Sequence, residues 1–256
     1  MRRPVPAAER MKIIPSWLIF LAAVFLPAAA VRAGFFLDLE GGLANNLYND
    51  IRVPGDTGTR FSLTDDFSVD NTLFWRARLG WEGGRHSISL LAAPLRFTAS
   101  GDAPEDIVFT DRTFPAGESL SAGYRFDSYR ATYRYRLVQT RALDFGLGLT
   151  GKVRDAAIRL SGDGRRAEKT NVGFVPLVNF RLEWRFARPL SLLLEGDALA
   201  APQGRAEDVL LALQYRVREN LSARLGYRIL EGGADNDRVY NFSAVGYFGL
   251  GLTYRL

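Results

Sequence analysis

The sequence predicts an all-β fold: a single transmembrane antiparallel up-and-down β-barrel of about ten strands, with eight or twelve strands as alternatives. Three observations favour this fold. A motif of aromatic, arginine and apolar residue recurs four times, apolar residues alternate with polar ones over most of the chain, and short connections alternate with long ones. The chain has 256 residues, a length at which such a barrel commonly forms one domain.

The four copies of the motif close alternating runs of sequence, and the last copy is the C-terminus. They are Tyr135-Arg136-Leu137, Trp184-Arg185-Phe186, Tyr215-Arg216-Val217 and Tyr254-Arg255-Leu256. Because neighbouring side chains of a strand point to opposite faces, the aromatic and apolar residues share one face and the arginine takes the other. A membrane-spanning barrel has this pattern at its rim, with aromatic rings at the lipid boundary and charges turned into the lumen.

Residues 1–33 have the pattern of a cleavable signal peptide, with a signal anchor as the alternative. The apolar stretch 13–31 follows two bases, is interrupted by prolines and ends in Val31-Arg32-Ala33, a small-residue cleavage pattern. Gly34 is therefore the expected first mature residue. Met11 is an alternative translation start to Met1, since the segment from Met11 resembles a complete signal peptide. We expect one barrel domain over residues 34–256.

Most of the excess of basic over acidic residues lies in the N-terminal segment. The formal net charge is +5, but residues 1–33 hold five bases and one acid, which leaves 28 bases and 27 acids in the barrel region. No clustered basic face supports binding to nucleic acid. The chain has no cysteine, so disulfides and thiolate chemistry are excluded.

The first half of the barrel is expected to contain five strands, at residues 35–48, 69–82, 86–100, 122–138 and 142–160. The second strand alternates clearly, with Leu73 and Trp75 opposite Arg76. The first and third strands are weaker, and Pro94 disturbs the alternation of the third. The fourth strand ends in the first copy of the motif. In the fifth, glycines alternate with outward residues such as Leu147.

The second half is expected to contain five more strands, at residues 170–187, 190–200, 206–218, 220–231 and 238–256. In the first of these, apolar residues occupy every second position from Val172 to Phe186, opposite Arg181 and Glu183. The last strand carries nine residues of one outward face from Tyr240 to Leu256. Such alternation indicates strands with one apolar and one polar face.

The connections fall into two classes. Tight turns are expected at 82–85, 139–141, 188–189 and 218–220, and longer polar loops at 49–68, 101–121, 161–169 and 232–237. The loop at 101–121 is expected to form a hairpin in which Ile107-Val108-Phe109 alternates against Ser119-Leu120. The connection around Gln203-Gly204 is short for its side of the barrel. Short turns on one side and long loops on the other are typical of membrane β-barrels.

Aromatic residues gather near the predicted short turns. The expected girdle on the outward phase consists of Trp81, Tyr135, Phe145, Trp184, Phe186, Tyr215 and Tyr254. A secreted β-sandwich is the alternative fold, but a sandwich buries its largest aromatics in mid-strand, where packing is densest. Aromatics at strand ends instead indicate a membrane–water boundary.

With these features, residues 34–256 resemble bacterial outer-membrane β-barrel proteins. Phe248, Leu250, Leu252 and Tyr254 match the alternating C-terminal sorting pattern of that family, whereas Leu256 departs from its usual aromatic ending. The resemblance implies export to the outer membrane and short turns on the periplasmic side. It also implies insertion by the outer-membrane assembly machinery through the last strand, and contact with outer-membrane lipids and lipopolysaccharide. The oligomeric state is left open.

The inward phase predicts a belt of charged residues that lines the lumen. Its members are Arg76, Arg78, Glu82, Arg130, Arg134, Arg136, Asp144, Lys152, Arg181, Glu183, Arg185, Glu195, Asp197, Arg216, Arg224, Arg228 and Arg255, with Asp38, Glu40, Arg154 and Arg218 on the same phase. A ten-stranded barrel is little wider than an eight-stranded one, which side chains can fill. Arginines and carboxylates are then expected to pair. In the outer half of the barrel the inward residues are mostly uncharged, for example Leu177 and Leu210.

Three functions fit these predictions. An arginine-rich lumen favours a narrow pore for anionic solutes, and the alternative is a structural, ligand-binding or adhesion barrel closed by a lumenal salt-bridge network. A lipid-modifying enzyme or protease is a weaker alternative. The single histidine, His86, follows a turn on the periplasmic side, away from where such enzymes hold their base, so we expect no catalytic residue.

Two further patterns predict no cofactor and no metal. The string Gly146-Leu147-Gly148-Leu149-Thr150-Gly151 matches a nucleotide-binding spacing, but no helix is expected after it. Asp235-Asn236-Asp237 lacks the remaining ligands of a calcium loop and is expected to form a solvated turn.

Overall fold

The computed structural model describes residues 34–201 and 204–256. The predicted signal peptide, residues 1–33, lies outside the described residues, as does Gln203. The described residues belong to one compact unit. No helix in the described part of the chain is long and apolar enough to span a membrane.

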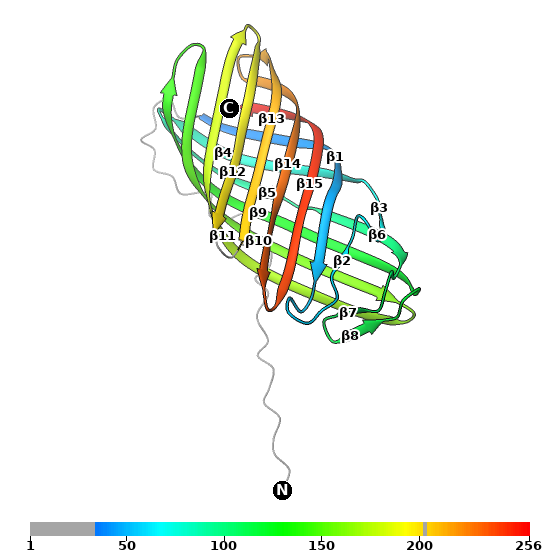
Figure 1. Ribbon diagram of the computed structural model, residues 1–256. Coiled ribbons are helices and arrows are strands. Elements are labelled where there is room, and N and C mark those ends of the chain that lie inside the picture. Colours follow the sequence, from blue (N-terminus) through cyan, green and yellow to red (C-terminus); the bar gives the residue numbers. More distant parts are fainter. Residues whose placement is uncertain (1–33, 202–203) are drawn as a thin grey trace. The chain divides into compact units, whose positions relative to one another are not determined.

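The described residues form a closed antiparallel barrel with ten strand positions (Figure 1). In order along the chain its strands are β1 (Gly34–Arg52), β4 (Thr72–Gly83), β5 (His86–Ala93), β6 (Arg96–Asp102), β9 (Ser119–Gln139), β10 (Leu143–Gly162), β11 (Arg165–Ala187), β12 (Leu190–Ala201), β13 (Gly204–Arg218), β14 (Leu221–Asn236) and β15 (Val239–Arg255). The barrel closes where β15 pairs with β1, from Phe36 opposite Arg255 to Arg52 opposite Tyr240. The predicted fold class is confirmed.

One strand position is shared by β5 and β6, which follow each other along the same side of β9. Both strands pair with β9: His86 of β5 lies opposite Tyr135, and Arg96 of β6 lies opposite Arg125. The break between them contains Pro94, which has no N–H to donate to a neighbouring strand. The proline that disturbed the predicted alternation therefore interrupts a real strand.

Side chains alternate between the lumen and the outer face as predicted. On β4 the outward Leu73 is 79 % exposed and Trp75 is 56 % exposed, whereas the inward Phe74 and Arg76 are buried. On β11 the outward Phe174 is 70 % exposed. Because a shift of one residue would reverse every side chain, this alternation fixes the register of the barrel wall.

The two ends of the barrel differ in their connections. At one end, the short-turn end, residues 84–85, 140–142, 188–189 and 219–220 join successive strands. At the other end, the loop end, long segments follow β1 and β6. Two predicted long loops are wrong: 161–169 and 232–237 consist largely of paired strand. The first closes in a two-residue turn, Asp163-Gly164, with φ of 42° and 72°, as expected for an Asp-Gly hairpin.

The long segments of the loop end fold into a compact cap. It contains β2 (Phe61–Ser62), β3 (Ser68–Val69), β7 (Ile107–Phe109) and β8 (Arg112–Phe114). The predicted hairpin is present, but its second arm is β8, because Phe109 pairs with Arg112. Ser119 and Leu120 belong instead to β9, where they pair with β6.

The cap has its own apolar core, which continues into the barrel. Phe61 packs edge-on against Phe109 with ring centroids 6.1 Å apart, and Phe109 and Phe114 are fully buried. Deeper in the same cluster, Phe74 of β4 meets Tyr247 of β15 at 4.9 Å. Apolar side chains therefore fill the loop end of the lumen.

The seven residues of the predicted girdle lie on strands near the short-turn end. Tyr135, Trp184, Phe186, Tyr215 and Tyr254 are exposed on the outer face, and Trp81 and Phe145 are half-buried. Their role at a lipid boundary stays a prediction.

Candidate functional site in the lumen

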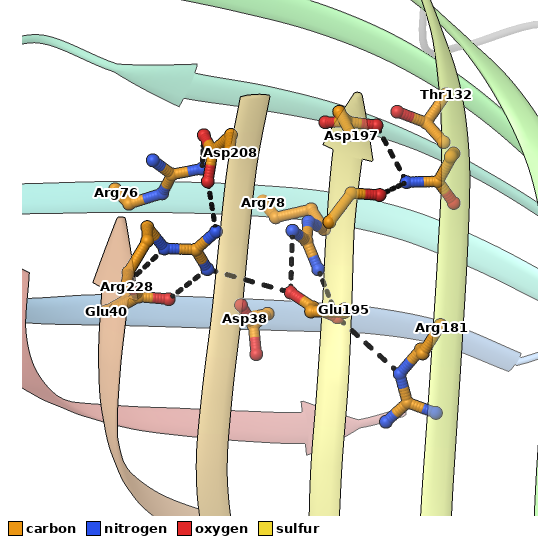
Figure 2. Close-up of polar contacts among 12 residues, drawn as sticks. Asp38, Glu40, Arg76, Arg78, Thr132, Arg181, Glu195, Asp197, Asp208 and Arg228 are labelled. Atoms are coloured by element: carbon orange, nitrogen blue, oxygen red, sulfur yellow. Dashed lines mark hydrogen bonds and ion pairs between the residues drawn. The ribbon is translucent and has the colours of Figure 1, made fainter. Parts of the chain in front are cut away.

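Buried ion pairs centred on Asp208 of β13 cross the lumen of the barrel. The Asp208 carboxylate is 1 % exposed and accepts hydrogen bonds from Arg76 at 3.1 Å, Arg130 at 2.5 Å and Arg228 at 2.5 Å. Arg76 of β4 and Arg130 of β9 each lie four strand positions from β13 around the barrel. These contacts therefore join opposite walls of the barrel, and Figure 2 shows Asp208 among its neighbours.

Glu40 of β1 extends this cluster through two arginines of β14. Arg228 donates to both oxygens of Glu40 at 2.9 Å, and Arg224 donates to Glu40 at 2.9 Å. Arg224 also donates to both oxygens of Asp38. Two-pronged pairs of arginine and carboxylate are the strongest hydrogen-bonded ion pairs in proteins, because both groups are charged and planar.

Glu195 of β12 connects the cluster toward the short-turn end, as Figure 2 shows. Its nearest cation is Arg78 at 3.0 Å, followed by Arg181 at 3.6 Å and Arg228 at 3.8 Å. We call these buried pairs, without the more exposed pairs at the strand ends, the lumen network. It comprises Asp38, Glu40, Arg76, Arg78, Arg130, Arg181, Glu183, Glu195, Asp197, Asp208, Arg224 and Arg228.

Uncharged polar side chains complete the network around Asp197 of β12. This carboxylate pairs with Arg130 at 2.7 Å and accepts hydrogen bonds from Thr150 at 2.6 Å and Asn179 at 2.8 Å. Buried charges are tolerated when their partners satisfy them. The interior of the barrel meets that condition at Asp197.

A second layer of ion pairs lies nearer the short-turn end. Arg136 donates to Glu82 at 2.5 Å, and Arg255 lies 4.0 Å from the same carboxylate. Arg185 lies between Glu183 at 3.1 Å and Asp144 at 3.8 Å. This layer comes from strand ends, which explains its greater exposure to solvent.

Five residues of the predicted inward phase form no ion pair with any described residue: Arg134, Lys152, Arg154, Arg216 and Arg218. Arg154 donates to Asn171 at 2.5 Å, and Arg218 is exposed at the end of β13. Arg134 donates to Asn179 at 3.3 Å. Lys152 is 2 % exposed, and its ammonium lies 4.8 Å from the ring centroid of Phe126, in the geometry of a cation–π contact. Arg216 is exposed at the end of β13. The structure brings the other members of the belt into ion pairs.

Little space remains between these side chains. A cavity of ≈ 20 Å³ lies beside Arg78, Glu195 and Arg224, which is room for about one water molecule. On the loop-end side of the network, Tyr247 of β15 lies opposite Arg228 of the neighbouring β14 in the strand register. The Tyr247 ring also contacts Phe74. The apolar core of the cap thus begins where the lumen network ends, and both fill the lumen.

Asp208 was missed by the sequence analysis, although it is the centre of the network. The signal was present, because Asp208 has the same phase as the inward Leu210 and Gln214. It also pairs in register with Asp197, which was predicted to face inward. Thr150 was missed for a different reason: an uncharged polar side chain does not stand out on an inward face.

The structure places the remaining candidate groups away from the lumen. His86 is exposed, and its Nδ1 lies 2.8 Å from the hydroxyl of Tyr133 at the short-turn end. Asn236 accepts the backbone N–H of Arg238 at 3.0 Å, so the Asp235-Asn236-Asp237 segment closes a turn. Among the described residues, no group of three or more His, Cys, Asp or Glu side chains is arranged to hold a metal ion.

Comparisons with known proteins give the fold its context. No protein-family model matches the chain, and no curated protein matches it. Among solved structures, the outer membrane protease OmpT from Escherichia coli is similar with a TM-score of 0.57 and 9 % identity, over 87 % of this chain and 97 % of that one.

Two further solved structures share less of the geometry. The transport unit of the autotransporter AIDA-I from Escherichia coli gives a TM-score of 0.48 at 8 % identity, over 91 % of this chain and 94 % of that one. Neisserial surface protein A gives 0.36 at 13 % identity, over 88 % and 99 %. At these identities the likeness concerns the fold alone. The chain has the fold of the bacterial outer-membrane β-barrel proteins.

Proposed function

We propose that this protein resides in the bacterial outer membrane as a barrel closed to solutes, with a structural or ligand-binding role. Export through a signal peptide at residues 1–33 and insertion by the outer-membrane assembly machinery are parts of the proposal. The observation that carries it is the lumen network, in which Asp208 is held by arginines from three strands.

The energetics of the lumen favour a closed state. Removing one partner from a buried ion pair costs about 3–5 kcal/mol, because the other charge stays buried without compensation. An open pathway through the lumen would have to separate Arg130 from Asp208 and also Arg228 from Glu40. It would also displace the apolar core of the cap, in which Phe109 is fully buried.

The cap is the surface through which such a protein would meet ligands outside the cell. Backbone hydrogen bonds join its two halves, since Thr59 donates to Val108 at 2.9 Å and Thr110 donates to Val53 at 2.8 Å. A rigid cap presents a defined surface, as binding or adhesion requires. Its exposed acids, such as Asp102 and Glu105, are suited to lipopolysaccharide contact through divalent cations.

Planar-bilayer recording of the folded protein tests the closed barrel. We expect no conductance steps from protein whose folding is verified by heat-modifiable migration in a gel. A bacterial porin recorded under the same conditions is the positive control for conductance. Steps from the wild type would contradict the proposal, and anion-preferring reversal potentials would indicate a pore instead.

A narrow anion pore is the second candidate, and one observation favours it. Lys152 and Arg134 face the lumen without a carboxylate partner among the described residues, so they leave positive charge available to a passing anion. In that case Lys152→Gln would reduce anion preference while the protein stays folded.

The proposal assigns no catalytic reaction to the barrel. His86 lies on the outer face, where its described polar and aromatic contacts are with Tyr133 and Tyr135. OmpT is named a protease, but the likeness to it is one of fold. The His86→Ala variant is expected to fold and to bind any ligand of the cap like the wild type.

A further inference from the structure

A pocket of ≈ 400 Å³ opens at the short-turn end of the barrel, on the lumen side of the wall. We call it the mouth pocket. Arg141, Arg185, Arg188 and Arg216 line it, together with Glu183 and an apolar wall that includes Leu190. Pockets of this volume hold small organic ligands.

Positive charge is in excess in the mouth pocket. Arg141, Arg188 and Arg216 are exposed and form no ion pair with any residue in the described ranges. The carboxylate of Glu183 is already shared by Arg181 at 3.3 Å and Arg185 at 3.1 Å. It is therefore not free to neutralise the three unpaired arginines.

The backbone around the pocket is held in place by hydrogen bonds between its three segments. Arg185 donates its N–H to Ala142 at 2.7 Å, and Arg216 donates its N–H to Pro189 at 3.0 Å. The Arg185 guanidinium also donates to the carbonyl of Thr140 at 3.1 Å. The turn after β9, the turn after β11 and the end of β13 thus keep a fixed spacing before any ligand arrives.

We propose that the mouth pocket binds a phosphate group carried by a small organic molecule, presented from the periplasmic side. A phosphate monoester carries nearly two negative charges and three acceptor oxygens, which suits several guanidinium forks at once. Arginine is the side chain best matched to phosphate in geometry. The wall at Leu190 and Pro189 offers an apolar surface to the rest of the molecule.

This binding site goes beyond the proposed function and does not depend on a closed lumen. The pocket residues lie at the ends of strands, outside the contacts of Asp208 and Glu40 that fill the middle of the barrel. A failure of phosphate binding would leave the conductance result unchanged. Conductance by the wild type would equally leave the pocket intact.

Titration calorimetry with phenyl phosphate tests the proposal, using the full mature chain in phospholipid-free detergent and acetate as the weaker anion. We expect saturable binding of phenyl phosphate that weakens with added salt. Arg141→Gln, Arg188→Gln and Arg216→Gln are each expected to weaken it about tenfold, as loss of one charge-assisted hydrogen bond predicts. Heat-modifiable migration verifies that each variant folds.

Arg218→Gln is the matched control, since Arg218 is exposed at the end of the same strand but does not line the pocket. Its affinity should equal that of the wild type. The proposal is overturned if phenyl phosphate does not bind saturably, or if Arg218→Gln weakens binding as much as Arg216→Gln.

A second arm identifies the source of the phosphate. The titration is repeated in nanodiscs of phosphatidylglycerol, whose headgroups carry phosphate. Binding that is lost in nanodiscs and present in detergent supports a lipid headgroup as the occupant. Binding that persists in both supports a soluble periplasmic phosphate compound.

Discussion

Arginines of the lumen network and of the mouth pocket come from neighbouring parts of the same wall, yet their surroundings differ. Arg228 is buried and meets Glu40 and Asp208, whereas Arg216 at the end of β13 is exposed and meets no carboxylate in the described part of the chain. In the network a guanidinium holds strands together across the lumen. In the mouth pocket it remains available to a ligand. Whether a carboxylate lies within reach, and not the inward phase alone, therefore decides what an inward arginine does.

Asp208→Ala is the strongest test of the lumen network. It leaves Arg76, Arg130 and Arg228 buried around a missing carboxylate, and we expect a loss of about 3–5 kcal/mol in the free energy of unfolding. Unfolding by urea in detergent, followed by heat-modifiable migration, measures it. Wild-type stability in this variant would show that the network does not hold the barrel together.

The second prediction separates the network from the cap. Phe109→Ala opens a cavity in the apolar core of the cap, where large-to-small changes cost about 3–5 kcal/mol when the site cannot collapse. Because the cap lies beyond the barrel strands, we expect this loss to unfold the cap locally. Limited proteolysis should then cut residues 103–118 while the barrel keeps its heat-modifiable form. Unfolding of the whole barrel would mean that the cap and the network act as one unit.

The mouth pocket should respond in the opposite way. Arg216→Gln is expected to change the free energy of unfolding by no more than about 0.5 kcal/mol, as is usual for an exposed side chain without partners. The same variant should weaken phosphate binding about tenfold, whereas the Arg218→Gln control keeps the wild-type affinity. A strongly destabilised Arg216→Gln protein would place Arg216 with the structural arginines.

An arginine paired at the surface is also expected to contribute little to stability. Arg159 lies 3.0 Å from Glu168 where β10 and β11 pair near the loop end, and both side chains are partly exposed. Solvent screens such pairs, so Arg159→Ala should cost about 0.2–1 kcal/mol. The same urea titration measures it. A loss as large as that of Asp208→Ala would remove burial as the explanation for the strength of the network.

Much of the barrel wall could be predicted from the sequence, because alternation is a local property. Leu73 and Arg76 reveal their faces through their neighbours alone, and the motif copies mark strand ends in the same way. Loop lengths were harder: residues 161–169 are polar, yet Asp163-Gly164 forms a two-residue turn and the strands continue to it. Polarity indicates exposure to water, and a strand outside the membrane is exposed too.

By itself, the sequence determined the fold class and the phase of most strands, because a period of two is written into successive residues. It also placed many charged side chains on the inward face, although not Asp208. Which inward charges meet depends on the closed barrel, because closure brings Asp208 of β13 to Arg76 of β4 and Arg130 of β9. The stagger between distant strands sets those pairings, and no local pattern encodes it.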